Sequence, residues 1–157
     1  MKPLHRGIAL GVLQCLLVLS VAGKYAWDRE RLPRVWVKTA PVDPYLPIRG
    51  RYVSLRLEVA VPEGQTAQWT PVSLTVENGA LTARPAAART GIMVTGGKPW
   101  ALAEPVAYFI PEHAADPTRL HPGEELWVEV SVPPAGPPRP LRLGVRRAGV
   151  LTPIEIR

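Results

Sequence analysis

The side chains best suited to chemistry are concentrated in one short segment. Six imidazole or carboxylate groups fall within residues 112–125: Glu112, His113, Asp116, His121, Glu124 and Glu125. Imidazole nitrogens and carboxylate oxygens are ligands that zinc and related metals accept in proteins. Their spacing matches no established ligand pattern, however, and the prolines among them are typical of a solvated, turn-rich loop. We therefore expect neither a metal site nor a cofactor.

Nucleophilic catalysis finds little support in the remaining residues. After residue 27 the chain offers His113 and His121, with serines at Ser54, Ser73 and Ser131. A serine–histidine–acid arrangement would have to use Asp43 or Asp116, and the surroundings of the serines do not resemble a nucleophile elbow. The inventory of side chains favours a protein without catalytic function.

An uncharged apolar run occupies residues 7–23. In a helix it would extend about 26 Å, close to the roughly 30 Å of a bilayer's hydrocarbon core. Tyr25 and Trp27 suit the membrane interface, and Lys24 can extend toward it. The basic leader Met1–Arg6 and the small residues around Ser20 are also typical of a cleaved signal peptide. We expect residues 1–27 to form a membrane anchor, with a cleaved signal as the alternative.

The charges that flank the run bear on its orientation. More basic residues follow it than precede it, which by counting alone favours a cytosolic domain. Long domains are translocated largely regardless of charge, so we expect residues 28–157 to be extracytoplasmic, on the periplasmic or cell-surface side. Gly7 and Gly11 have the spacing that lets two membrane helices approach closely, so a weak homodimer is an alternative to a chance occurrence.

Composition limits the partners. The chain has 157 residues, a net charge of +6 and 46% hydrophobic residues, which fits one folded domain after the leading segment. Its basic residues are scattered and are not combined with a cluster of aromatic side chains. We expect no nucleic acid as partner and instead a membrane, contacted through residues 7–23.

The remaining chain alternates apolar and polar residues between prolines and glycines. In residues 51–61 one face carries Val53, Leu55, Leu57, Val59 and Val61. Further strands are expected at 72–76, 80–84, 91–95, 106–110, 126–132, 141–146 and 150–156, with hairpin turns at Asn78-Gly79 and Ala148-Gly149. Residues 133–140 are expected to be a stiff loop. We predict a single all-β domain, an antiparallel barrel or sandwich of about 7–8 short strands.

Two separate stretches resemble a known signature. Residues 42–55 read VDPYLPIRGRYVSL, and residues 108–112 read YFIPE. The first is similar to the Gly-Asp-Tyr-x-x-Leu-x-Tyr motif, with its preceding Val-Asp-Pro and Pro-x-Arg-Gly, of the GDYXXLXY family of small bacterial membrane-anchored proteins. The second resembles that family's Tyr-Phe-Val-Pro-Glu. Arg51 replaces the Asp of the motif and Leu57 its last Tyr, which puts any activity of those two residues in doubt.

The resemblance supplies candidate residues and a partner, but no activity, because the family has no assigned function. It implies structural or binding roles for the matching positions, which are Asp43, Pro44, Arg49, Gly50, Arg51, Tyr52, Leu55, Tyr108, Phe109, Pro111 and Glu112. Members of the family are often encoded beside a multi-pass membrane protein, which the resemblance implies as a partner. We expect the motif to have a structural and not a catalytic role.

These observations favour a non-catalytic, membrane-anchored β-domain protein that assists or binds an integral membrane protein. One alternative is a membrane-tethered hydrolase, because Arg49-Gly50-Arg51 is similar to an Arg-Gly-Asp run of signal peptidases; it would gather Glu112, Asp43 and Arg49 in one pocket. That chemistry needs a serine near the membrane, and the chain offers none between the anchor and Ser54. A second alternative is a barrel that binds a lipid, glycan or peptide in an internal cavity or at a strand edge.

Overall fold

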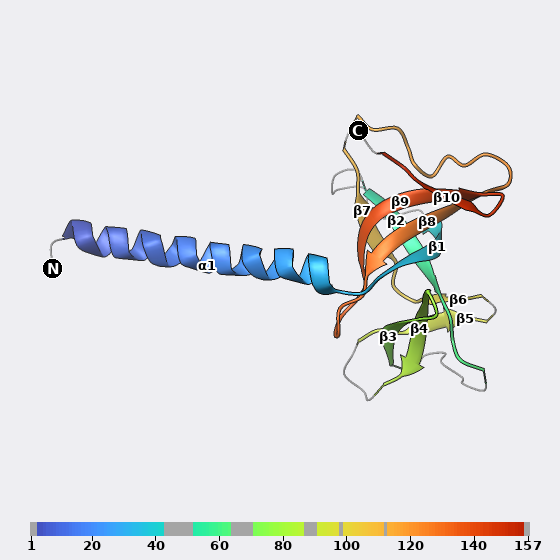
Figure 1. The fold of residues 1–157 in the computed structure, drawn as a ribbon, viewed down its shortest axis with the longest axis horizontal. Helices are drawn as coiled ribbons and strands as arrows, with labels where there is room; N and C mark the ends of the chain where they lie inside the picture. Colours follow the sequence, from blue (N-terminus) through green and yellow to red (C-terminus); the bar gives the residue numbers. More distant parts are fainter. Residues whose placement is uncertain are drawn as a thin grey trace. The chain divides into compact units, whose positions relative to one another are not determined.

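The computed structural model describes residues 3–42, 52–63, 71–86, 91–97, 99–111 and 113–155. The chain divides into two compact units, Met1–Leu32 and Pro33–Arg157. The first unit is a single helix, and the second, called the head from here on, contains all of the described strands (Figure 1).

The first unit is the helix α1, which runs from Pro3 to Arg31. Its segment Gly7–Trp27 has 21 residues and a mean hydropathy of 1.8, so by length and composition it could be a membrane span or a signal anchor. At about 1.5 Å per residue this segment extends about 31 Å, the thickness of a hydrocarbon core. Near the end of the helix the guanidinium of Arg31 lies over the ring of Trp27, 3.9 Å from its centroid. Pro33 follows two residues later and disfavours helical backbone at Leu32, which ends α1.

The head is built from antiparallel strand pairs, which confirms the predicted all-β fold with one N-terminal helix. The described strands are β1 (Arg34–Val42), β2 (Tyr52–Val59), β3 (Val72–Glu77), β4 (Ala80–Pro85), β5 (Val94–Gly96), β6 (Trp100–Leu102), β7 (Val106–Phe109), β8 (Glu124–Ser131), β9 (Arg139–Arg147) and β10 (Val150–Pro153).

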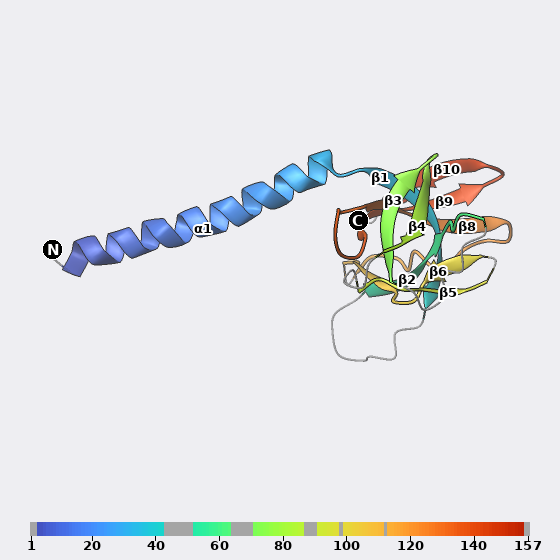
Figure 2. The ribbon, with the colours of Figure 1, turned by 90° about the horizontal axis from the view of Figure 1, so that it is seen from below.

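Eight of the strands form one sheet in the order β10-β9-β8-β1-β2-β6-β5, and β7 also pairs with β2. Among the described strands this path is open, because its ends β10 and β5 are not paired with each other. The hairpin β3–β4 forms a second, two-stranded sheet, and β4 lies against β1 and β2 (Figure 2). It is joined to the end of β2 by a parallel bridge between Ala60 and Thr82.

Alternation of side chains places one face of these strands in a common core. Leu55 and Leu57 of β2 are fully buried, as are Leu126 of β8 and Leu143 of β9. Each such leucine stabilises the head by about 1.5–3 kcal/mol relative to an exposed position. The face predicted for residues 51–61 is therefore the core face.

Both predicted hairpin turns are present. Asn78 and Gly79 join β3 to β4 with φ angles of 51° and 74°. Ala148 and Gly149 join β9 to β10 with φ angles of 49° and 84°. Two successive residues with positive φ twist in the same sense as the strands they connect, which is why Asn-Gly predicts such turns well.

The sequence-based strand assignment was incomplete in three places. It missed β1, although Val35, Val37 and Thr39 are buried on alternate positions, and it missed the short β6. The expected loop 133–140 ends two residues early, because β9 already begins at Arg139. Pro140 is tolerated there because it lies opposite Val130 at a register shift, where a proline without an N–H disturbs the ladder least.

Candidate functional site

The two stretches of the family motif are neighbours in the sheet. β7 pairs with β2 so that Tyr52 lies opposite Phe109 and Val53 opposite Tyr108. The rings of Tyr52 and Phe109 are 6.0 Å apart between centroids and tilted by 49°. The pairing of β2 with β7 thus builds one aromatic surface, called the motif patch (Tyr52 and Phe109), from residues far apart in the sequence.

The other described motif residues on these strands point inward. Leu55 is fully buried, and Tyr108 packs against the core. Burial raises the pKa of the Tyr108 phenol above its usual value. Leu57, which stands where the family motif has its last tyrosine, is also fully buried. These three positions therefore serve core packing, and the change to Leu57 alters the core and not the surface.

Phe109 differs from every other described motif residue. It is the single phenylalanine of the chain, and 73% of its surface is exposed. Tyr52 beside it is half-buried, and Pro111, two residues further on, is exposed. A large apolar side chain that stays this exposed contributes little to the burial that stabilises the fold.

The remaining motif residues lie outside the described part of the chain. They are Asp43, Pro44, Arg49, Gly50, Arg51 and Glu112. The hypothesis of a pocket that gathers Glu112, Asp43 and Arg49 consequently stays a prediction.

A second aromatic surface lies at the other end of the same sheet face. Because paired residues share a face, the even-numbered positions of β1, β2 and β9 point outward with the odd-numbered positions of β8. We call the central part of this surface the tryptophan face; it consists of Trp36, Lys38, Glu125, Trp127, Glu129, Arg142 and Arg146. Trp36 and Trp127 are half-buried and lie on the outward face of the sheet, not in the core.

An arginine lies over each of the two tryptophan rings. The guanidinium of Arg142 lies 5.4 Å from the centre of the Trp36 ring, and that of Arg146 lies 4.9 Å from the centre of the Trp127 ring. Arg142 also donates to Glu129 at 2.6 Å. Such stacked cations shield the rings from water, and each contributes about 0.5–1 kcal/mol at exposed sites.

Glu125 of β8 links Lys38 of β1 to Trp127 of β8 on the tryptophan face. Its Oε1 accepts a hydrogen bond of 2.7 Å from the ammonium of Lys38, and its Oε2 accepts one of 3.3 Å from the indole N–H of Trp127. The hydrogen bond from Lys38, together with that from Trp127, lowers the pKa of the Glu125 carboxyl. The same bond to Glu125 raises the pKa of Lys38. The polar groups of this surface thus bind one another.

Gly144 of β9 makes room for the Trp36 ring. A methyl group on its Cα would lie 2.9 Å from Cζ3 of Trp36 and 3.1 Å from the main-chain oxygen of Thr152. Both contacts are closer than side chains normally tolerate, so the position requires glycine for space. No local sequence signal identifies this role of Gly144, because it arises from the pairing of β1 with β8 and of β8 with β9.

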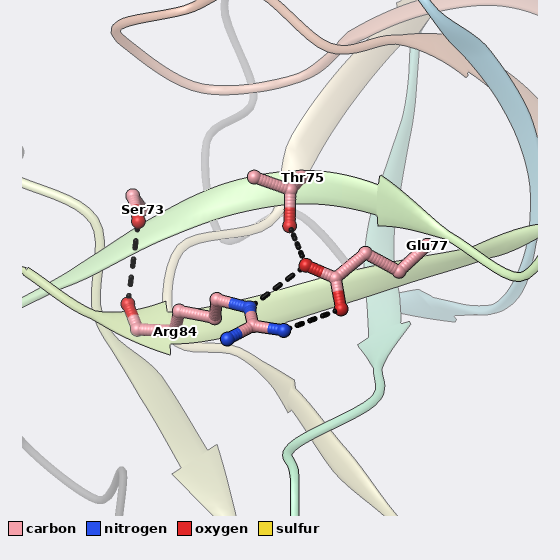
Figure 3. A network of polar contacts seen from close by, with 4 residues as sticks. All are labelled: Ser73, Thr75, Glu77 and Arg84. Carbon is pink, nitrogen blue, oxygen red and sulfur yellow. Dashed lines mark hydrogen bonds and ion pairs between the residues drawn. The ribbon is translucent and has the colours of Figure 1, made fainter.

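The hairpin β3–β4 carries a separate polar network (Figure 3). Arg84 donates to both carboxylate oxygens of Glu77, with distances of 2.7 and 2.8 Å, and Thr75 donates to the same carboxylate at 3.0 Å. The hydrogen bonds from Arg84 and Thr75 lower the pKa of Glu77. The hydroxyl of Ser73 lies 3.5 Å from the main-chain oxygen of Arg84. The network holds the register of the hairpin on an exposed surface.

The described residues offer shallow grooves. One of about 550 Å³ is lined mainly by small or apolar residues, among them Ala114, Pro117, Leu120 and Ile154. The core of the described strands consists mainly of leucine and valine side chains. Within the described ranges no group of three histidine, cysteine or acidic side chains is placed to hold a metal ion.

Fold and surface together define a small all-β head with an exposed aromatic patch, preceded by one apolar helix. The profile of the GDYXXLXY protein family matches residues 14–143, more than four fifths of the chain. The chain therefore belongs to the GDYXXLXY family. No curated protein and no solved structure matches the chain significantly.

Proposed function

We propose that the protein is anchored in a membrane by α1 and that its head binds an integral membrane protein through the motif patch. The apolar segment Gly7–Trp27 has the length of a bilayer core and supports the anchor. The basic leader and the long following domain support an extracytoplasmic head. The role is one of binding and assistance, not catalysis.

The exposure of Phe109 carries this proposal. The fold itself gains little from the ring, since 73% of it is exposed. Its burial by a partner would stabilise a complex by about 1.5–3 kcal/mol, the range of the aromatic residues that dominate protein interfaces. Tyr52 widens the apolar surface and brings a hydroxyl that can bond to the partner.

The chemistry of the described side chains fits a binding role. Ser73 and Ser131 each lie 3.5 Å from a main-chain oxygen of the neighbouring strand, which is a structural use of a serine hydroxyl. His113 and His121 are exposed in the segment before β8. Aromatic side chains such as Phe109 are enriched in protein–protein interfaces, which favours a protein as the partner.

Photo-crosslinking in native membranes tests the proposal. The full-length chain carries p-benzoylphenylalanine in place of Phe109, and a matched control carries it in place of Val150, whose side chain is 67% exposed on the β9–β10 hairpin. We expect a discrete adduct with a membrane protein from position 109 and none from position 150. Equal labelling at both positions, or none at either, would contradict a specific patch.

A second measurement gives the size of the contribution. Phe109→Ala should weaken capture of the crosslinked partner by about ten- to a hundredfold, the effect of 1.5–3 kcal/mol of lost apolar burial. The yield of folded protein in the membrane should not change. Val150→Ala is the matched control and should leave capture intact.

A further inference from the structure

Two polar side chains interrupt the apolar interior of α1, and only one has a partner. The hydroxyl of Ser20 donates to the main-chain oxygen of Leu17 at 2.8 Å, so the helix satisfies it internally. The carboxamide of Gln14 is exposed on the helix surface and makes no hydrogen bond with any residue in the described part of the chain. Gln14 carries two N–H donors and a carbonyl acceptor that the helix leaves open.

At the position of Gln14, an amide without hydrogen bonds is costly in a membrane. It lies three residues from the middle of the segment Gly7–Trp27, about 4.5 Å along the axis. At that depth there is no water to bind the amide, and lipid tails offer neither donors nor acceptors. Because Gln14 is close to the bilayer centre, its side chain cannot reach the interface as a long basic side chain near a helix end does.

The face that bears Gln14 is suited to another helix. Successive steps of four and three residues place Gly7, Gly11, Gln14, Val18 and Val21 along one side of α1. Around Gly7 and Gly11 nothing lies within 4 Å of the place where a Cβ would stand, so a second backbone can come close there. Gln14 therefore lies on the same face of α1 as the two glycines that allow close approach.

We propose that two copies of α1 pair in parallel and that their Gln14 side chains hydrogen-bond to each other. A carboxamide is both donor and acceptor, so two identical groups related by a twofold axis satisfy one another. Two copies inserted in the same orientation place their Gln14 side chains at the same depth in the membrane. A helix of a different protein would need its own polar side chain at that depth. The inference rests on the proposed membrane anchoring of α1.

A cysteine scan of the full-length chain in native membranes tests the geometry. In a Cys15→Ser background, single cysteines replace Val18 or Val21 on the proposed interface, and Leu16 or Leu19 on the opposite side. We expect oxidation to produce a disulfide-linked dimer from positions 18 and 21 only. Equal crosslinking on both sides, or an adduct with a different protein in place of the dimer, would overturn the pairing.

The role of Gln14 is tested by substitution in the Val18→Cys chain. Gln14→Leu should lower the dimer association constant about five- to thirtyfold, the effect of one interhelical hydrogen-bonded pair. Gln14→Asn, which keeps the amide, should retain most of the dimer. Ser20→Ala is the matched control and should have no effect, because that hydroxyl is already bonded within its helix. An unchanged dimer in Gln14→Leu would overturn the role of the amide.

Alkaline extraction of the same membranes separates this inference from the proposed function. A chain that stays in the membrane but yields no dimer overturns the pairing alone and leaves the anchor in place. A chain released by alkali overturns both. Loss of the adduct at position 109 with the dimer intact overturns only the motif patch as a binding surface.

Discussion

Two regions on the outward face of the main sheet carry aromatic side chains, and they differ in what lies over the rings. On the tryptophan face, Arg142 covers Trp36 and Arg146 covers Trp127, with Glu125 and Glu129 binding cations of the same surface. On the motif patch, the tilted ring of Tyr52 lies beside Phe109, which is 73% exposed.

The difference separates two uses of an aromatic residue. Where the surrounding strands bring their own cations and carboxylates, the ring completes the outer layer of the head and stabilises it. At the motif patch, the outward position of β7 two residues before Phe109 is the small, exposed Ala107, and the Phe109 ring is left open to solvent. Four sets of substitutions test this distinction.

Removal of a covered ring should have the largest effect on stability. Trp36→Ala should lower the free energy of unfolding by about 2–3 kcal/mol, because the half-buried ring fills the space above Gly144. Phe109→Ala should change it by less than about 0.5 kcal/mol. Urea titration followed by circular dichroism measures both. A loss at Phe109 as large as that at Trp36 would make the motif patch part of the stabilising layer.

A methyl group added beneath the Trp36 ring should have the second-largest effect on the free energy of unfolding. Gly144→Ala should lower the free energy of unfolding by about 1–3 kcal/mol, because the new methyl group overlaps the ring and the main chain of β10. Gly97→Ala is the matched control, since nothing lies within 4 Å of its added methyl group. Equal stability of the two variants in the same titration would show that Trp36 moves aside freely.

Removal of the Arg142 cation should lower the free energy of unfolding by a smaller amount. Arg142→Met keeps the apolar stem but leaves the largely buried Glu129 without its donor, which should destabilise the head by about 1 kcal/mol. The double variant Glu129→Met with Arg142→Met should recover most of this loss, because neither charge is left unpaired. Urea titrations of the two single variants and the double variant form the thermodynamic cycle. Full additivity would show that the pair does not act as a unit.

The smallest effect is a pH dependence from Lys38 and Glu125. The lowered pKa of Glu125 stabilises the folded head above its ordinary value of 4.5, and this is lost as pH falls through the folded pKa. The raised pKa of Lys38 stabilises the head below its ordinary value of 10.5, and this is lost as pH rises through the folded pKa. The combined variant Lys38→Met with Glu125→Gln should therefore be less stable than the native chain near neutral pH, and the difference should shrink as the pH falls below the folded pKa of Glu125. The loss should be small because both side chains are about 40% exposed. Parallel curves of stability against pH for the two proteins would contradict this.

Much of the fold follows from local sequence. Period-two alternation identifies β2 and its buried face, because the side chains of a strand alternate whatever it pairs with. Asn78-Gly79 and Ala148-Gly149 identify two hairpins, because those turns need adjacent residues with positive φ. The apolar run identifies α1. The strand β1 was missed because its inward row is short and includes Thr39, so its place between β8 and β2 depends on pairings with distant residues.

Local sequence therefore identified the helix and most of the strands, though not β1 or β6, together with the buried face of β2 and the family signature in residues 42–55 and 108–112. Strand pairing in the folded head places Tyr52 beside Phe109, points Tyr108 inward and Phe109 outward, and brings arginines of β9 over tryptophans of β1 and β8. These contacts do not follow from local sequence, because periodicity is a property of a single strand, whereas exposure depends on which strands pair and in which register.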